Sequence, residues 1–344
     1  MTNPAPDTDE FEAALQWSTR EDEQHFARTQ DGWNISLRRY LPHGTRSLPI
    51  VLGHGFAGSS WIFDLSEETS MAGALARAGF DTWSLDWRGR GDSWPDNGAD
   101  ESLQWCFDDF VFRDAPAAVA KVREITGAPA VLWVGMEESG IAAYAIAISQ
   151  LAPIAAAVTM GSPMWAVPEA EIPGVTTPLP ERDGTRYRFS MVKEVGPILA
   201  AQESEYIDSS FRVDNTDWFV TGRYFRNGVP DEASEAVDQY KDWVEHDTMR
   251  SRDCSVVWSD RADEFTIPVL VMVAAFDKQR PPASVERTFA ALGSADKTFI
   301  KVGKEHGFAH DYGHDDLVAG RHARIEVTGR IIDWLIDHDA APGS

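Results

Sequence analysis

The stretch Val131-Leu132-Trp133-Val134-Gly135-Met136-Glu137-Glu138-Ser139-Gly140 decides the fold of this chain. Its first half is an apolar run that predicts a buried strand, and the Ala-rich segment from Gly140 to Leu151 predicts a helix. A strand that turns sharply into a helix needs small residues two positions before and two positions after the turn residue, because the two elements pack closely there. Gly135 and Ser139 meet that need if the turn residue is Glu137.

This pattern has the strand–turn–helix context of a G-x-S-x-G nucleophile elbow, in which a strained turn presents the central residue. The central residue here is Glu137, a carboxylate where the motif has serine. Ser139 is a poor alternative nucleophile, because it lies one helical step past the turn and takes the place of the small packing residue. The local sequence therefore predicts the scaffold of a serine hydrolase whose mechanism depends on Glu137.

On both sides of this stretch, strands alternate with helices. Strands are predicted at Trp33–Leu41, Pro49–Gly53, Phe80–Asp86, Ala130–Val134, Ile154–Met160, Ile267–Ala275 and Thr298–Val302. Helices are predicted at Leu65–Gly79, Asp108–Gly127 with a kink or break at Pro116, Gly140–Leu151, Glu232–Met249, Ala283–Leu292 and Arg324–His338. Such alternation predicts a mostly parallel central sheet with helices on both faces.

The alternation is interrupted once, by a segment rich in Trp, Pro and charged residues. We therefore expect one α/β core, formed by residues 21–162 and 263–344, with residues 163–262 inserted as a cap or lid. Residues 1–20 are polar and acidic, and they are expected to form a mobile acidic tail. No internal repeat or low-complexity tract accompanies these segments.

The composition excludes several classes of partner. The 344 residues include 31 basic and 55 acidic ones, for a net charge of −24, which argues against nucleic acid or an anionic membrane. No apolar run reaches the roughly 18 residues of a membrane span, and the N-terminus lacks the features of a signal peptide. Cys106 and Cys254 are too few for a disulfide scaffold, so a cytoplasmic location is expected.

Several motifs in order give the chain a family resemblance. They are the elbow, Gly53-His54-Gly55-Phe56, the stretch from Phe80 to Ser93 that contains Asp86-Trp87-Arg88-Gly89-Arg90-Gly91-Asp92-Ser93, the segment Pro268–Pro282, and Asp311-Tyr312-Gly313-His314-Asp315-Asp316-Leu317. With these motifs the chain resembles the α/β-hydrolase family, especially its lipase-like and polyhydroxyalkanoate-synthase-like members, over most of residues 30–340. The resemblance implies the α/β-hydrolase fold with an inserted cap.

The resemblance also implies a catalytic site. The backbone N–H groups of Phe56 and Glu138 would form the oxyanion hole, while His54 is more consistent with a structural role. Asp277 stands after a strand, where the family carries the acid that orients the catalytic histidine. With Glu137 and His314, it gives the chain order nucleophile, acid, histidine that the fold uses.

Three histidines follow the last predicted strand. His314 matches the motif of the lipase-like branch, and His306 is the alternative base because many relatives place the histidine closer to the strand. A metal site is disfavoured, because Gly313 argues against His310 and His314 sharing one helical face. Arg88, in the glycine-rich turn, is expected to support the site through an ion pair.

Glu137 leaves three mechanisms open. A carboxylate is ionised near neutral pH, and a helix N-terminus favours the anion, so Glu137 needs no base to attack. In the first hypothesis it is a covalent nucleophile, as in relatives with Asp at the elbow that open epoxides or displace halide, and His314 then activates water. In the second it is a general base of a lyase, isomerase or cyclase. In the third the protein only binds a ligand, although intact Asp277 and His314 argue against that.

The pocket is expected above the carboxyl ends of the strands, beneath the cap. Aromatic residues of the cap could bind a hydrophobic ester, lactone or epoxide, although most of them are expected to form the core of the cap itself. They are Trp165, Trp218, Trp243, Trp258, Phe211 and Phe225. No phosphate loop is present, so chemistry without a cofactor is expected.

Overall fold

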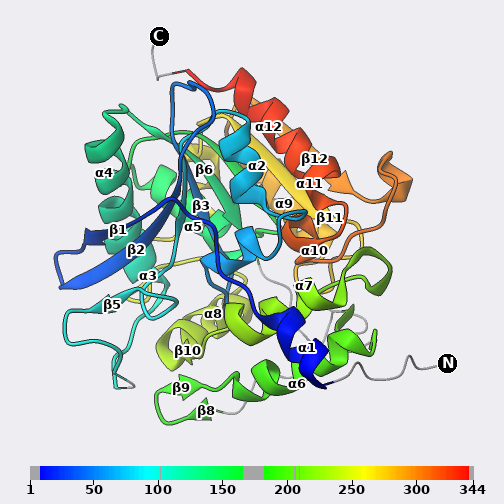
Figure 1. Cartoon of the computed structure of the whole chain (residues 1–344). Helices are drawn as coiled ribbons and strands as arrows, with labels where there is room; N and C mark the ends of the chain where they lie inside the picture. Colours follow the sequence, from blue (N-terminus) through cyan, green and yellow to red (C-terminus); the bar gives the residue numbers. More distant parts are fainter. Residues whose placement is uncertain (1–7, 101, 166–181, 205–206, 209, 341–344) are drawn as a thin grey trace.

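The computed structural model describes residues 8–100, 102–165, 182–204, 207–208 and 210–340. A nine-stranded sheet runs through its centre in the order β1-β2-β4-β3-β6-β7-β11-β12, with β5 paired to β2 (Figure 1). Its strands are β1 (Glu23–Arg28), β2 (Trp33–Tyr40), β3 (Ile50–Gly53), β4 (Thr82–Leu85), β5 (Trp94–Pro95), β6 (Val131–Met136), β7 (Ile154–Met160), β11 (Val269–Ala274) and β12 (Lys297–Val302). All pairings from β4 to β12 are parallel, which confirms the predicted sheet.

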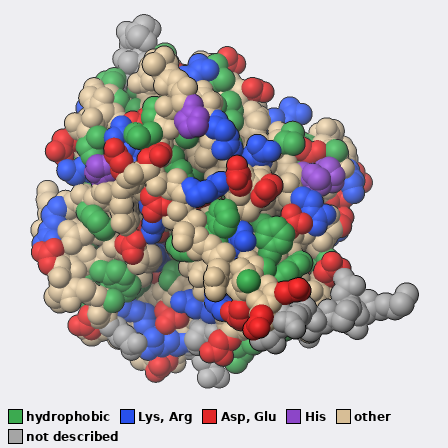
Figure 2. Space-filling view, viewed as in Figure 1, with side chains coloured by type: hydrophobic (Ala, Val, Ile, Leu, Met, Phe, Trp, Pro, Cys, Tyr) green, Lys and Arg blue, Asp and Glu red, His purple; other side chains and the backbone are tan. Residues whose placement is uncertain are grey.

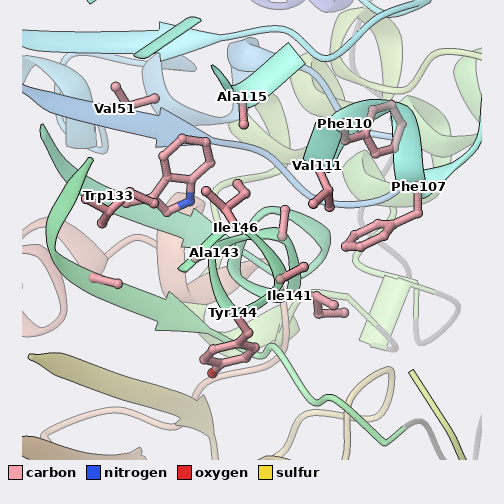
Figure 3. Packing of buried hydrophobic residues seen from close by; sticks show 14 of the residues in the cluster. Val51, Phe107, Phe110, Val111, Ala115, Trp133, Ile141, Ala143, Tyr144 and Ile146 are labelled. Atoms are coloured by element: carbon pink, nitrogen blue, oxygen red, sulfur yellow. The ribbon is translucent and has the colours of Figure 1, made fainter. Parts of the chain in front are cut away.

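The central strands are buried on both faces, as their continuous apolar sequences predict. Alternate residues of one strand enter different core clusters: Val131 and Trp133 of β6 face one side, and Leu132 and Val134 face the other. Figure 3 shows part of the first cluster, where Trp133 and residues of the helix after β6 fill the space beside the sheet. The sheet therefore needs helices on both faces, and it has them.

Helices cover the two faces as the alternation predicts. The α-helices of the described residues are α1 (Thr8–Leu15), α2 (Met71–Arg77), α3 (Phe107–Asp109), α4 (Ala115–Thr126), α5 (Glu138–Ile148), α6 (Ser190–Ala201), α7 (Trp218–Arg223), α8 (Ser234–His246), α9 (Pro282–Ala291), α10 (Asp316–Ala319), α11 (Ala323–Glu326) and α12 (Thr328–Asp337). Helices α4 and α5 contribute to the core on one face, while α2 and α12 contribute on the other (Figure 1). The strand β1 was missed in the sequence, because its inward side chains include the polar Glu23 and His25 while the apolar Phe26 is exposed, so the apolar alternation of a half-buried strand is absent.

The helix predicted at Asp108–Gly127 is continuous past Pro116 but irregular before it. It starts as α3, passes through a π-helical turn at Phe110–Asp114 and continues as α4. Pro116 is the second residue of α4 and directly follows the π-helical turn, so its missing N–H falls where the helix changes from the π to the α hydrogen-bond pattern. The irregular turn therefore precedes the proline instead of following it.

The prediction of a mobile tail at residues 1–20 is wrong for its second half. Residues 8–15 form α1, and Leu15 is buried. The Trp17 indole N–H donates to the backbone oxygen of Asp64 at 2.7 Å, and Arg20 pairs with the Asp64 carboxylate at 2.6 Å. These long-range contacts offset the loss of chain entropy in a segment whose acidic composition alone favours disorder. The first seven residues lie outside the described part of the chain.

The described helices and strands between β7 and β11 lie against the end of the sheet where the parallel strands finish (Figure 1). It contains α6, α7, α8 and a small sheet of β8 (Arg182–Asp183), β9 (Arg186–Tyr187) and β10 (Glu232–Ala233). Most of its predicted aromatic residues are packed, since Trp243, Trp258, Phe211 and Phe225 are all buried. These four side chains hold the segment together and onto the core.

Charged side chains of both signs are intermixed over the surface in Figure 2. Many of the basic ones are paired, for example Arg39 with Asp81 at 2.7 Å and Arg287 with Asp247 at 2.8 Å. No helix in the described part of the chain is long and apolar enough to cross a membrane.

Candidate active site

Glu137 occupies a strained turn between β6 and α5. Its φ of 47° and ψ of −107° are rarely adopted by a residue with a side chain, and such a conformation costs on the order of 1–3 kcal/mol. Strands β3 and β6 pair with Gly53 opposite Gly135, so the loops that follow them lie side by side. The fold therefore presents Glu137 next to the loop that begins at His54.

Gly135 and Ser139 have the packing roles that their spacing predicts. A Cβ at Gly135 would lie 2.4 Å from the nitrogen of Gly140, a distance that backbone atoms cannot accommodate. A Cβ at Gly53 would lie 1.7 Å from Ser139 Oγ, so the serine is packed directly against β3. Ser139 is buried, and its hydroxyl has no hydrogen-bond partner in the described residues, which leaves it in the place of a small packing residue.

We expect Gly135→Ala to lower the free energy of unfolding by about 3 kcal/mol, because the added methyl group meets backbone that cannot move without shifting α5. Urea denaturation of the purified variant measures this loss. Gly329→Ala is the matched control, because no atom lies within 4 Å of its Cβ position. That helix residue should keep or gain stability, by up to about 1 kcal/mol. Equal stability of the two variants would contradict the close approach at the elbow.

The Glu137 carboxylate is held at both oxygens. Its Oε2 accepts a hydrogen bond of 2.6 Å from the backbone N–H of Phe56, the donor predicted for an oxyanion hole. Its Oε1 accepts from Arg280, through Nε at 2.9 Å and through Nη2. Burial alone would raise the pKa of Glu137, but Arg280, His314 and the Phe56 N–H together lower it below its usual value. Glu137 is therefore an anion at neutral pH.

Asp277 and His314 form the acid–histidine pair that the resemblance implied. Asp277 Oδ2 lies 2.7 Å from His314 Nδ1, and both side chains are buried. Asp277 Oδ1 accepts from the backbone N–H groups of Gln279 and Arg280, which fixes the carboxylate at the end of β11. Because an ionised carboxylate can only accept a hydrogen bond, the Nδ1 of His314 carries the proton. The other ring nitrogen, Nε2, is then free to accept a proton in a reaction.

The imidazole of His314 has a fixed position and a raised pKa. A Cβ at Gly161, which follows β7 with φ of 58°, would lie 2.9 Å from the imidazole Cε1, so only glycine leaves room for the ring. Nε2 makes no hydrogen bond with any residue that the structure describes. Burial lowers the pKa of His314, but the carboxylates of Asp277, Asp315 and Glu137, with Asp277 first, together outweigh burial and the net shift is upward.

The other histidines lie in different surroundings. His306 is exposed in a short 3-10 helix, Lys304–His306. His310 is 3.2 Å from Glu326 Oε1 and stacks on His322 at 3.5 Å between ring centres. His54 is buried, and burial lowers its pKa well below the usual value, so the neutral ring accepts from the Trp87 N–H as a structural group.

Two arginines of the glycine-rich turn have separate roles. Arg88 is buried and pairs with Asp114 at 2.6 Å and with Asp31 at 2.8 Å, so the predicted ion pair is confirmed. Arg90, which the sequence did not single out, is the one that reaches the elbow. It pairs with Glu138, the first residue of α5, and with Glu232 of β10.

Arg90 is the centre of a buried network between the elbow and the inserted segment. The Tyr240 hydroxyl of α8 donates to Glu138, and the Trp105 indole donates to Glu232 at 2.9 Å. Burial raises the pKa of Glu138 to about 7, although Arg90 acts in the opposite direction. These contacts hold the Glu138 side chain and thereby fix the position of the residue, whose backbone N–H is the second predicted oxyanion donor. The catalytic role of this N–H stays a prediction.

Comparisons with known proteins agree on one family. The family model for the alpha/beta hydrolase fold matches residues 49–311. Human "Lysosomal acid lipase/cholesteryl ester hydrolase" is 29% identical over 153 residues, which are 40% of this chain and 37% of that protein. Human "Lipase member M" is 31% identical over 170 residues, 44% of this chain and 39% of that protein. The match thus spans less than half the length of these curated relatives.

Solved structures resemble the chain over nearly its whole length. A soluble variant of monoglyceride lipase from Saccharomyces cerevisiae, in complex with a substrate analog, has a TM-score of 0.61 and 16% identity and covers 98% of this chain and 100% of its own. Monoacylglycerol lipase from Paleococcus ferrophilus has a TM-score of 0.57 and 17% identity and covers 88% and 99%. At these identities the likeness establishes the shared fold.

Proposed function

Because the chain belongs to the alpha/beta hydrolase fold family, we propose that it is a hydrolase in which Glu137 attacks a hydrophobic small molecule to form a covalent ester. His314 would then activate the water that breaks this ester, and Asp277 would orient His314. The lipases among the relatives support hydrolysis in general. The geometry around Glu137 and the pairing of Asp277 with His314 support these roles.

The hydrogen bond from the Phe56 N–H to Glu137 Oε2 is the observation that supports this mechanism. In a serine hydrolase the oxyanion hole receives the carbonyl oxygen of the substrate in the first step. Here the nucleophile's own oxygen occupies it. The hole is therefore placed for the second step, in which water attacks the Glu137 Cδ and the developing negative charge lies on Oε2.

This placement favours attack on saturated carbon over attack on an ester carbonyl. Attack on a carbonyl would give an anhydride, and its oxyanion would need the donor that Glu137 already uses. Attack on an alkyl carbon gives a glutamyl ester, whose hydrolysis uses the same donor without rearrangement. Epoxides and lactones fit this chemistry better than ordinary esters.

Partly exposed aromatic rings near Phe56 support a hydrophobic substrate. The Phe56 ring lies 5.6 Å from the ring of Tyr240 and 6.3 Å from that of Phe189, and all three rings are partly exposed. Tyr240 and Phe189 belong to the segment between β7 and β11. We propose that this segment acts as the lid of the site and binds the apolar part of the substrate.

One observation favours a second candidate function. Arg280 binds Glu137 Oε1, the oxygen that would attack, and an ion-paired carboxylate is a weaker nucleophile and a weaker base. If this pair never opens, the protein would be a ligand-binding member of the family, or a non-hydrolytic enzyme that uses Glu137 or His314 as a base. The side chain of Arg280 is 30% exposed against 5% for Glu137, so the arginine is the partner that can move.

Trapping the ester separates the two candidates. In His314→Gln the first step remains possible but water is not activated, so Glu137 should carry the mass of the substrate after incubation with a panel of epoxides and lactones. Mass spectrometry of the peptide that contains Glu137 measures the adduct. His306→Gln, at an exposed position, is the matched control and should turn over without accumulation. Absence of an adduct with every substrate, together with no turnover by the wild type, would favour the second candidate.

The raised pKa of His314 sets the pH dependence of the second step. The base must be neutral to accept a proton from water, so kcat is expected to rise with pH with a midpoint above the usual 6.5. Asp277→Asn removes the charge that raises this pKa, and the midpoint should move to lower pH while kcat falls. Pre-steady-state rates of deacylation between pH 5 and 9 measure both changes, and an unmoved midpoint would contradict the assignment.

A further inference from the structure

We infer that Arg280 receives the leaving group of this reaction as a carboxylate, so that the substrate is a lactone or related ester opened at its alkyl carbon–oxygen bond. This inference rests on the proposed function and narrows its substrate class. The guanidinium contacts Glu137 Oε1 directly and would touch the group that departs. No motif in the sequence pointed to Arg280.

The charge of Glu137 has to move during the first step. When Oε1 bonds to the alkyl carbon, the bond from that carbon to the ring oxygen breaks and its electron pair stays on the oxygen. Glu137 becomes a neutral ester, and the negative charge now belongs to the leaving oxygen. Arg280 thereby loses its counterion at a position where its side chain is only 30% exposed, and an unpaired charge is costly there. A leaving group that binds Arg280 keeps the cation paired throughout the step.

The hydrogen-bond donors of Arg280 suit a carboxylate. Nε and Nη2 donate to Glu137 Oε1, and Nη1 donates to the backbone oxygen of Gln279 at 3.0 Å. A guanidinium has five N–H groups, so one on Nη1 and one on Nη2 have no hydrogen-bond partner among the described residues. Two such donors on neighbouring nitrogens match the two oxygens of a carboxylate. The neighbouring cation, Lys278, is already paired with Asp208 at 2.5 Å.

The site is less suited to a leaving group that needs a proton. An epoxide leaves an alkoxide, which must be protonated, and an arginine at neutral pH cannot supply the proton. The Tyr240 hydroxyl, near Phe56, already donates to Glu138. A carboxylate leaves as a stable anion and needs no proton. The chemistry around Glu137 therefore favours a lactone over an epoxide.

The second step returns the site to its starting state. His314 Nε2 takes a proton from water, and the hydroxide adds to Glu137 Cδ while the Phe56 N–H stabilises the charge on Oε2. The bond from Cδ to Oε1 then breaks, the product alkoxide takes the proton from His314, and the product leaves as a hydroxy acid. One oxygen of the regenerated Glu137 carboxylate now comes from water.

Turnover in ¹⁸O-labelled water tests the inference. The probe is a chiral β-lactone with a long alkyl chain, and an epoxide of the same chain length is the comparison substrate. Opening at the alkyl carbon inverts that carbon and, after the first turnover, places the label in the product hydroxyl. Opening at the carbonyl retains the configuration and places the label in the product carboxylate, which would overturn the inference.

Variants at position 280 test the role of the cation. Arg280→Gln is expected to lower kcat for the lactone by roughly 10²–10³-fold, with a smaller change in KM, because a charge that forms in the transition state loses its partner. Arg280→Lys should retain part of the rate, since it keeps the charge without the paired donors. Arg261→Gln, at an exposed ion pair, is the matched control and should behave as the wild type. Equal rates for Arg280→Gln and the wild type would overturn the inference.

The label in Glu137 distinguishes failure of this inference from failure of the proposed function. Incorporation of ¹⁸O into Glu137 with the epoxide, without turnover of the lactone, would keep the nucleophile and overturn the assignment of the leaving group. Absence of ¹⁸O from Glu137 with every substrate that is hydrolysed would overturn both.

Discussion

Glu137→Gln is expected to lower kcat by roughly 10⁴-fold or more on the substrate that the wild type hydrolyses best, because the amide cannot form the covalent ester. The change keeps the shape of the side chain and the acceptor for the Phe56 N–H, so binding of the substrate should change less than turnover. Steady-state kinetics of the purified variant, with kcat and KM measured separately, provide the comparison.

A second variant separates loss of chemistry from loss of structure. Glu137→Gln also leaves the half-buried Arg280 without its counterion, and this can reduce stability. Glu137→Asp keeps the charge on a side chain about 1.5 Å shorter, so it should retain more activity than Gln. Glu305→Gln, at an exposed position, controls for the loss of one negative charge. Full activity of Glu137→Gln would show that another group carries the reaction.

Arg90→Met is expected to lower the free energy of unfolding by about 3–5 kcal/mol. The substitution keeps most of the volume but leaves Glu138 and Glu232 facing each other in a buried site without the cation between them. Arg261→Met is the matched control, because that exposed pair with Glu264 should contribute at most about 1 kcal/mol. Urea denaturation at pH 7 measures both values.

The pH dependence of this loss identifies its cause. Burial raises the pKa of Glu138 from its ordinary value of 4.5 to about 7 in the folded protein. The free energy of unfolding therefore falls as pH rises between these two values, because the unfolded chain loses the Glu138 proton first. Without Arg90 the folded-state pKa rises further. The deficit of Arg90→Met should therefore be smaller at pH 5 than at pH 8. A deficit that is equal at both pH values would point to lost packing instead of unpaired charge.

The fold and the elbow were predictable from the sequence because they depend on local patterns. The apolar run Val131–Met136 is buried on both faces, and a period of two residues divides it between two cores. Gly135 and Ser139 lie where the strand and the helix of the elbow come into close contact. Any sequence that makes this turn needs small residues at these two positions. The pairing of Asp277 with His314 followed from family motifs, and the structure brings these two residues together at 2.7 Å.

The charged partners of the elbow could not be predicted because they are brought together only by the tertiary fold. Arg280 lies 143 positions from Glu137, and Arg90 lies 142 positions from Glu232. No local sequence pattern around either arginine indicates which carboxylate it pairs with, although Arg280 follows Asp277 by three residues. Each buried carboxylate is expected to have a buried cation as its partner, but which cation that is depends on the tertiary fold.

The Arg90 network has a consequence for protein engineering. Buried charges join the segment between β7 and β11 to the core, so the two parts are not separable modules. Exchanging this segment for that of a relative would remove Glu232 and Tyr240 and leave Arg90 and Glu138 without these partners in a buried site directly behind the elbow. A chimera should therefore move all four residues as one unit, or replace all four with apolar side chains.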